Sequence, residues 1–211
     1  MPAMPGPVDR RRREENEIEF ARIVAFSDGV FAIAITLLVL GLDIGPHHVH
    51  DLWHVIGEQW DNFLAYAISF AVIGRFWIVH HRFFGEVKAF DGRLLWLNIL
   101  YLATVVLIPF SSKVLGEYSG HTPAAVVYAG NLALVVLVGL WMTTYAHRAG
   151  LTTSDAPTKR ENRIRASYIA AIFLASIPVA FVAPGIAELM WLALFFDPGS
   201  RFSGREASPS Q

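Results

Sequence analysis

Cysteine is absent from this chain of 211 residues, and charged residues are scarce. The lack of cysteine excludes disulfides, thiolate metal ligands and cysteine nucleophiles. Charged side chains make up 17% of the sequence, against roughly 25% in soluble domains, whereas 54% of the residues are hydrophobic and the mean hydropathy is +0.43. Neither sign of charge is in excess, because 17 Lys and Arg face 18 Asp and Glu. This composition argues against a water-soluble globule and against nucleic-acid binding.

The apolar residues gather in six segments, which predict an all-α, polytopic membrane protein. These segments are Glu19 to Leu42, Phe63 to Val79, Leu94 to Phe110, Ala124 to Met142, Ala166 to Ala183 and Ile186 to Phe196. A helix needs about 20 residues to cross hydrocarbon ~30 Å thick, and four or five of the segments are long enough. The last segment is short and carries Glu188, so a re-entrant or tilted interfacial segment is the alternative to a sixth span.

Basic residues fall on one side of this predicted array. Cytoplasmic loops retain Lys and Arg, and here Lys113 is the only one of the 17 basic residues in the first, third or fifth connection. That alternation requires an even number of spans, so we predict six helices and two cytoplasmic termini in a protein of the cell membrane. Residues 1–18 then form a cytoplasmic tail, residues 19–197 the transmembrane domain and residues 198–211 a disordered cytoplasmic tail.

The first apolar segment carries two stripes at helical spacing. Ile33, Leu37 and Leu40 form an aliphatic ridge at i, i+4 and i+7, in line with Phe26. Beside the ridge runs a strip of small residues, which is typical of membrane helices that approach each other closely. The strip consists of Ala25, Gly29, Ala32 and Thr36. We expect it to pack against another helix, whereas Leu38 points about 140° away from Ile33.

Polar residues at the start of the same helix need partners, because polar groups inside a bilayer are costly. Ser27 and Asp28 project away from the ridge, and Arg22 is too far around the helix to pair with Asp28. Partners must therefore come from neighbouring segments, where several polar side chains stand at matching depth. These candidates are Arg75, Trp77, His80, His81, Arg82 and Asn98. We expect a buried polar cluster that holds three helices in register, in preference to a direct role in ion handling or gating.

Histidines suggest two other kinds of site, and the sequence favours neither. The connection after the first segment contains His47, His48, His50 and His54. The last two have the i, i+4 spacing of metal ligands, but no third ligand is matched to them. His80 and His81 invite a catalytic interpretation, but adjacent histidines on a helix point about 100° apart and no nucleophile elbow, phosphate-binding loop or H-E-x-x-H motif accompanies them. We therefore predict no metal site and no enzyme.

Three stretches resemble a known channel family. Arg22, Phe26, Ser27 and Asp28 form the pattern R-x-x-x-F-S-D, which runs on through GVFAIAITLLVL. This stretch resembles the signature of the endosomal, lysosomal and bacterial potassium channels called transmembrane protein 175. FWIVHHRFF at 76–84 and LLWLNILYLATVVLIPFSS at 94–112 are similar to the second and third helices of that family. The resemblance is close over about the first half of the chain and rests on hydropathy in the remainder.

The resemblance implies a six-helix subunit, without a TVGYG filter, whose first helix lines the central pore of a homotetramer. It implies that Ile33, Leu37 and Leu40 constrict the pore and that Thr36 adds a layer of hydroxyl groups beside them. It also implies an interhelical polar network that anchors the first helix. The network residues are Arg22, Phe26, Ser27, Asp28, Trp77, His80 and Asn98.

The predicted function is passive conduction of potassium, with no cofactor and with the bilayer, monovalent cations and further copies of the chain as partners. One helix cannot enclose a pore, so this function requires a homo-oligomer. A proton-permeable channel and a secondary ion transporter are the alternatives. A transporter would favour internal repeats and charges at the bilayer midplane, which the two halves and the first helix do not provide. An intramembrane enzyme or scaffold would rest on His80 and His81 alone.

Overall fold

The computed structural model describes residues 7–42, 54, 57, 59–153 and 156–191. Its elements are α1 (Pro7–Leu37), the 3₁₀ helix η1 (Leu38–Gly41), α3 (Trp60–Glu86), α4 (Gly92–Val106), α5 (Ile108–Glu117), α6 (Thr122–Arg148), α7 (Ala156–Ala180) and α8 (Pro184–Met190). Within these ranges the only β-type pairing is an isolated antiparallel bridge between Val87 and Thr152. The all-α prediction is therefore confirmed for the described part of the chain.

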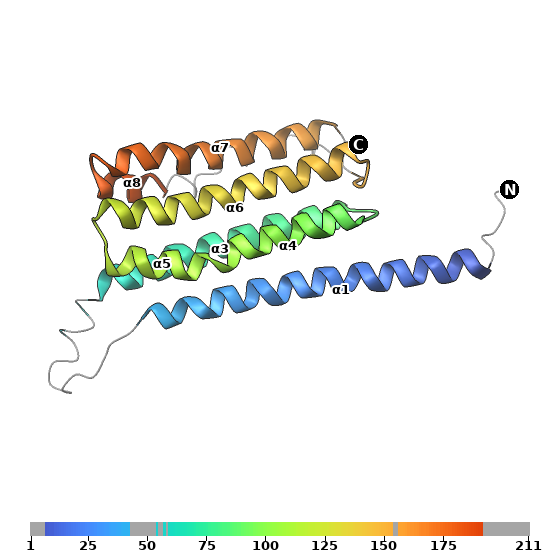
Figure 1. Cartoon of the computed structure of the whole chain (residues 1–211), viewed down its shortest axis with the longest axis horizontal. Coiled ribbons are helices and arrows are strands. Elements are labelled where there is room, and N and C mark those ends of the chain that lie inside the picture. Colours follow the sequence, from blue (N-terminus) through green and yellow to red (C-terminus); the bar gives the residue numbers. More distant parts are fainter. Residues whose placement is uncertain (1–6, 43–53, 55–56, 58, 154–155, 192–211) are drawn as a thin grey trace, which may run out of the picture.

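The long helices lie side by side in an antiparallel array (Figure 1). α1 occupies one edge, α3 and α4–α5 come next, and α6 lies between them and α7 at the other edge. Because successive long helices run in opposite directions, the α3–α4 and α6–α7 connections lie at the same end of the array as the beginning of α1. The edge position of α1 leaves much of its surface uncovered by the rest of the chain.

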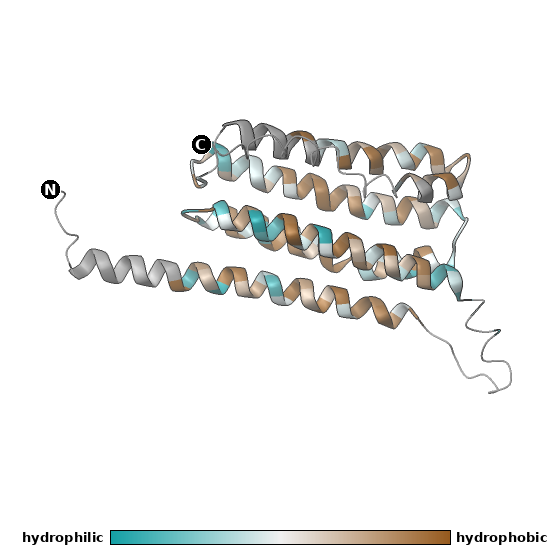
Figure 2. Ribbon diagram, turned by 180° about the vertical axis from the view of Figure 1, so that it is seen from behind, coloured by the Kyte–Doolittle hydropathy of each residue, from teal (hydrophilic) through white to brown (hydrophobic). Residues whose placement is uncertain are grey.

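Four helical stretches are long and apolar enough to cross a membrane, namely Ile18–Gly41, Trp60–Glu86, Gly92–Glu117 and Thr122–Arg148. They correspond to the first four predicted spans, and Figure 2 shows hydrophobic residues along most of their length. The fifth predicted span contains a shorter apolar stretch, Ser167–Ala180, within α7. The sixth begins as the seven residues of α8, whereas its end and the predicted 198–211 tail lie outside the described residues. The described residues thus provide four of the six predicted spans.

The first helix begins earlier than the sequence predicted. We expected residues 1–18 to form a tail, but α1 begins at Pro7. Proline fits the first turn of a helix, and the following residues are rich in Arg and Glu, which are good helix formers. The backbone therefore continues as one helix into the apolar part, and its first turns extend past the ends of the other helices (Figure 1). At its other end the helix tightens into η1, from Leu38 to Gly41.

The third predicted span is two helices rather than one. α4 ends at Val106 and α5 begins at Ile108, with Leu107 between them. Pro109 lies in the first turn of α5, where it has no N–H to donate and its ring would clash with the Val105 carbonyl of a continuous helix. Leu107 itself keeps an α-region backbone, and α4 and α5 together still form one apolar stretch, Gly92–Glu117, that is long enough to cross a membrane. The break thus interrupts the backbone hydrogen bonds between α4 and α5 without a sharp change of backbone conformation at Leu107.

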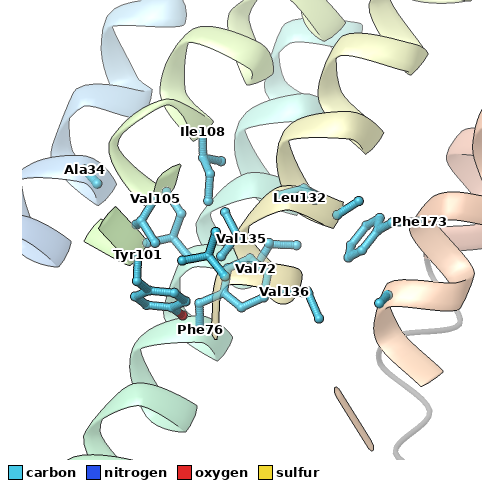
Figure 3. Close-up of a cluster of buried hydrophobic side chains, with 14 of the residues drawn as sticks. Ala34, Val72, Phe76, Tyr101, Val105, Ile108, Leu132, Val135, Val136 and Phe173 are labelled. Carbon is cyan, nitrogen blue, oxygen red and sulfur yellow. The ribbon is translucent and has the colours of Figure 1, made fainter. Parts of the chain in front are cut away.

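The core lies where α3, α4, α5 and α6 meet (Figure 3). Its labelled side chains include Phe76, Tyr101, Ile108 and Val135, all of which are buried. α1 contributes Ala34 at one edge of this cluster. Since lipid is as apolar as these side chains, close van der Waals packing stabilises such an interior more than removal from water does.

Two connections at the end where α1 begins are joined by hydrogen bonds. The N–H of Lys88 donates to the carbonyl of Leu151 at 2.9 Å, and the N–H of Thr153 donates to the carbonyl of Glu86 at 2.8 Å. These bonds flank the bridge at Val87 and tie the α3–α4 connection to the α6–α7 connection.

Asp91 adds a side-chain link at the same end. One carboxylate oxygen caps α4 by accepting a hydrogen bond from the N–H of Leu94 at 2.8 Å, and the other accepts one from the Tyr145 hydroxyl of α6. The bond from Tyr145, followed by that from Leu94, holds the pKa of the Asp91 carboxyl below its ordinary value. The Arg93 guanidinium lies 4.9 Å above the centre of the Tyr145 ring, so the same tyrosine links both residues to α6.

Asp91→Ala should lower the free energy of unfolding by about 1 kcal/mol near neutral pH, because α4 loses its N-cap. Since folding lowers the pKa of this carboxyl, its stabilising contribution is present above the ordinary pKa and is lost as the pH falls through the lowered one. Thermal unfolding in detergent at about pH 7 and about pH 3 tests this: the gap between wild type and variant should shrink at the lower pH. An undiminished gap would mean that the carboxylate charge is unimportant.

Candidate functional site

One face of α1 is fixed against the rest of the chain. Ser27, Phe31, Ala34 and Leu38 follow at intervals of four, three and four residues, and all four are buried. Such spacing places them on one side of the helix, which packs on α3, α4 and α5. Leu38, which the sequence placed away from Ile33, is 3% exposed.

The aliphatic ridge lies on an exposed side of α1, away from this buried face. Ile33 is 59% exposed and Leu40 69%, and Leu37 and Phe26 are exposed as well. Beside them the small residues Ala25, Gly29, Ala32 and Thr36 are exposed too. We expected this strip to pack against another helix, but it faces away from the helices of its own chain. The Thr36 hydroxyl donates to the Ile33 carbonyl at 2.9 Å, which leaves its oxygen free to accept a hydrogen bond from water.

Ser27, Asn98 and His80 form a buried hydrogen-bonded chain across three helices, here called the Ser27 cluster. The Ser27 hydroxyl donates to the Ile23 carbonyl at 2.9 Å and accepts from the Asn98 amide nitrogen at 3.0 Å. The Asn98 oxygen lies 2.8 Å from His80 Nε2. Because that oxygen can only accept, His80 donates through Nε2 and is held in a single orientation. The cluster therefore joins α1, α4 and α3.

Aromatic rings enclose the imidazole of this cluster. The His80 ring is stacked on Tyr101 with centroids 5.5 Å apart and an interplanar angle of 12°. Phe84 lies 4.5 Å from it and Phe31 of α1 lies 5.4 Å from it. His80 therefore contributes to packing as well as to hydrogen bonding. This arrangement suits a structural role better than proton transfer.

Asp28 pairs with a different helix residue, Trp77. The indole Nε1–H of Trp77 donates to Asp28 Oδ1 at 2.8 Å. We expected the Asp28 carboxylate to be buried, but it is half-buried in a single chain and Trp77 is exposed. His81 stacks on Trp77 with ring centroids 5.5 Å apart. The bond to Trp77 thus lies at the margin of the covered face of α1, beside the Ser27 cluster.

The structure brings together five of the seven residues predicted to form the network. Ser27, His80 and Asn98 are joined directly, and Asp28 and Trp77 are joined beside them. Arg22 and Phe26 are exposed, and within the described residues no hydrogen bond of this network involves them. Both lie on the uncovered side of α1, with the aliphatic ridge.

Sequence reasoning missed a second set of buried polar residues, between α3, α5 and α6. Ser69, Ser112 and Tyr128 form it and are here called the Ser112 cluster. Part of the signal was present, since Ser69 and the neighbouring Asn131 are polar residues within predicted apolar segments, whereas Ser112 lies two residues beyond the segment that ends at Phe110.

The histidine-rich connection lies mostly outside the described residues, which include His54 but not His47, His48 or His50. In the ranges that the structure describes, no group of three His, Asp or Glu side chains converges as metal ligands would.

Comparisons with known proteins place this geometry in a family. The sequence profile of "Endosomal/lysosomal potassium channel TMEM175" matches residues 22–109, from the start of the apolar part of α1 to the first turn of α5. A potassium channel of Streptomyces collinus is 38% identical in an alignment 177 residues long, which covers 78% of this chain and 84% of that protein. The chain belongs to the TMEM175 family. Its relatives are named as channels, which agrees with the prediction that it is not an enzyme.

Further relatives of this TMEM175 chain include a solved structure. The crystal structure of a lysosomal potassium-selective channel TMEM175 homolog from Chamaesiphon minutus superposes with a TM-score of 0.75 at 30% identity, over 90% of this chain and 99% of that one. The endosomal/lysosomal proton channel TMEM175 of Gallus gallus is 30% identical in an alignment 141 residues long, which covers 60% of this chain and 28% of that longer protein.

Asn98→Ala should destabilise the protein by about 1–3 kcal/mol, because His80 and Ser27 lose a buried partner that water does not replace. Trp77→Phe is the matched comparison, since it removes one hydrogen bond at a partly exposed site, and it should cost only about 0.5–1.5 kcal/mol. Thermal stability followed by size-exclusion chromatography distinguishes the two variants. If Asn98→Ala were the more stable of the pair, the Ser27 cluster would not be the main anchor of α1.

Proposed function

We propose that this chain is one subunit of a homo-oligomeric, potassium-permeable cation channel in which α1 lines the pore. The exposed aliphatic ridge on α1 carries the proposal. Ile33, Leu37 and Leu40 are exposed on a side of the helix that its buried anchor, Ser27, does not occupy. Hydrogen bonds thus hold the buried face of α1 against α4, while its aliphatic ridge is exposed.

The edge position of α1 supports an assembly of several subunits. In the most apolar stretch of Ile18–Gly41 22% of the residues are buried, against 50% in Gly92–Glu117. A single helix encloses no pore, so copies related by symmetry must surround it. The exposed small residues Ala25, Gly29 and Ala32 let such copies approach closely. Four subunits is the number implied by the sequence resemblance, and we propose it for this chain.

Permeation in this channel depends on apolar rings rather than on a carbonyl filter. Copies of Ile33, Leu37 and Leu40 stack as three rings about the axis, and each ring narrows the pore and resists wetting. A cation there loses water without gaining new ligands, so discrimination among cations is modest. Thr36, exposed beside Ile33, supplies the nearest hydroxyl layer for water that accompanies the ion.

Potassium is the proposed permeant ion, and protons are the second candidate. The relatives from Streptomyces collinus and Chamaesiphon minutus are named potassium channels, and the first of them matches 78% of this chain. The vertebrate relatives are named proton channels, and the one from Gallus gallus matches 60%. The wider match to the bacterial potassium channels favours potassium. No cofactor is required for passive conduction.

The proposed orientation places the end at which α1 begins in the cytoplasm. Arg82, Lys88, Arg93 and Arg148 lie at or near the two connections that share this end, whereas Lys113 lies toward the other end. Exposed tryptophans fit the two membrane interfaces, with Trp96 in the second turn of α4 and Trp60 at the start of α3. With α7 and the α8 region as fifth and sixth spans, both termini are cytoplasmic, and the channel belongs to the cell membrane.

Ile33→Asn should increase cation current and reduce the preference for potassium over sodium, because a ring of amides wets more readily than a ring of isoleucines. The measurement is potassium, sodium and proton current through the reconstituted protein at matched protein density. A gain in proton current alone would favour a proton channel over a potassium channel.

The control for this variant is Leu134→Asn, an equally large change on an exposed apolar position of α6. Leu38 is unsuitable because it is buried, so an amide there would disturb folding. If Ile33→Asn and Leu134→Asn had the same effect, or if neither changed the current, α1 would not line the pore.

A further inference from the structure

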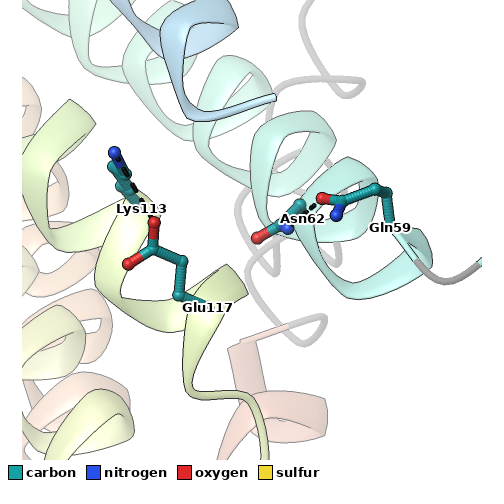
Figure 4. Close-up of polar contacts among 4 residues, drawn as sticks. All are labelled: Gln59, Asn62, Lys113 and Glu117. Atoms are coloured by element: carbon teal, nitrogen blue, oxygen red, sulfur yellow. Dashed lines mark hydrogen bonds and ion pairs between the residues drawn. The ribbon is translucent and has the colours of Figure 1, made fainter. Parts of the chain in front are cut away.

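α5 lies directly against the end of α1. A Cβ atom at Gly41 of η1 would stand 3.8 Å from Lys113 Cβ, so the two backbones are within ordinary van der Waals reach. The Lys113 ammonium forms an ion pair with the Glu117 carboxylate of the same helix, at 3.5 Å (Figure 4). α5 also approaches α3 closely, because a Cβ atom at Gly116 would overlap the Asn62 side chain. η1 therefore rests against α5 as well as against α3.

Two consecutive serines attach α5 to its other neighbours. Ser112 donates to the Ala65 carbonyl of α3 at 3.2 Å and accepts from the Ser69 hydroxyl at 2.8 Å. Because Ser69 donates its only hydroxyl proton to Ser112, the Tyr128 hydroxyl of α6, 2.9 Å away, must donate to Ser69. These three hydroxyls form one directed chain from α6 through α3 to α5.

Ser111 holds α5 from a second direction. Consecutive helical residues point about 100° apart, so Ser111 faces α6 while Ser112 faces α3. The Asn131 amide nitrogen donates to Ser111 at 3.0 Å, and Ser111 donates to the Ile108 carbonyl at 3.1 Å. The backbone hydrogen bonds are interrupted at Leu107, although Leu107 itself stays in the α region. The rotation of α5 is therefore set by this short connection to α4, by packing and by the hydrogen bonds of these two serines.

We propose that Ser112 is a positioning residue for η1 and thereby sets the width of the pore at Leu40. Ser112 does not contact the ridge. It fixes the rotation of α5, α5 supports η1, and η1 carries Leu40, which is 69% exposed. The consequence for permeation rests on the proposed pore role of α1, whereas the positioning of η1 does not. The ring at Leu40 would thus be held by the Ser112 cluster, and the ring at Ile33 by the Ser27 cluster.

Paired spin labels test the positioning directly, and the cysteine-free chain needs no background mutations. Leu40→Cys and Leu134→Cys, both at exposed positions, report the distance from η1 to α6 within one subunit when labelled subunits are diluted with unlabelled ones. Ser112→Ala should shift this distance by about 1–2 Å or broaden its distribution, whereas the distance from Ile33→Cys to Leu134→Cys should stay constant. Ser69→Ala combined with Ser112→Ala should add little further change.

Thr104→Val is the matched control, because Thr104 is buried but donates only to the Tyr101 carbonyl of its own helix. An equal shift in Thr104→Val, or an unchanged Leu40 distance in Ser112→Ala, would overturn the proposal. Single-channel recording of the unlabelled variants tests the effect on permeation. Ser112→Ala should change the unitary current and Thr104→Val should not. A shifted distance with an unchanged current would overturn the claim that this position limits permeation. Because the distances are measured within one subunit, failure of the positioning is distinguishable from failure of the proposed channel.

Discussion

The hydrogen bond from Asn98 to Ser27 fixes the rotation of α1, and the arrangement of the proposed pore depends on that rotation. A residue in a helix is offset by about 100° from the next, so holding Ser27 against α4 determines which side chains of α1 face away. Ile33, Leu37 and Leu40 are then exposed together, and Phe31, Ala34 and Leu38 are buried together. A rotation of α1 by about 90° would change which side chains are exposed, Ile33 and Thr36 among them. It would also separate the buried Ser27 from Asn98 and leave it without that partner.

Buried hydroxyl and amide side chains join neighbouring helices at two depths of the protein. The Ser27 cluster joins α1, α3 and α4, and the Ser112 cluster joins α3, α5 and α6. Apolar packing gains little from burial when the surrounding solvent is lipid, so a few satisfied polar contacts give the array its register. Each chain of donors ends on a backbone carbonyl, Ile23 in one cluster and Ala65 in the other. Neither cluster leaves a donor without an acceptor along the path described.

The sequence predicted the spans and the polar residues better than their geometry. Hydropathy located the first four spans because membrane thickness fixes the length of an apolar run. Polar residues at bilayer depth identified Ser27, Asp28 and Asn98 because such groups require partners. The choice of Trp77 for Asp28 depends on the rotation of α3, and the break at Leu107 depends on whether neighbours satisfy the carbonyls around Pro109. The spacing of residues along the chain determines neither this pairing nor this break. The small-residue strip was recognised from the sequence, but local spacing does not say which helix packs against it, and among the described residues it is exposed.

Cysteine accessibility at two consecutive positions of α1 tests whether the aliphatic ridge lines the pore. Ile33 and Ala34 differ by one residue, yet the first is exposed on the ridge and the second is fully buried against the core. In the cysteine-free background, a small water-soluble thiol reagent should react with Ile33→Cys and reduce the potassium current, and should leave Ala34→Cys and its current unchanged. Block of Ala34→Cys with no effect on Ile33→Cys would show that α1 presents its other face to the ions and that the aliphatic ridge does not line the pore.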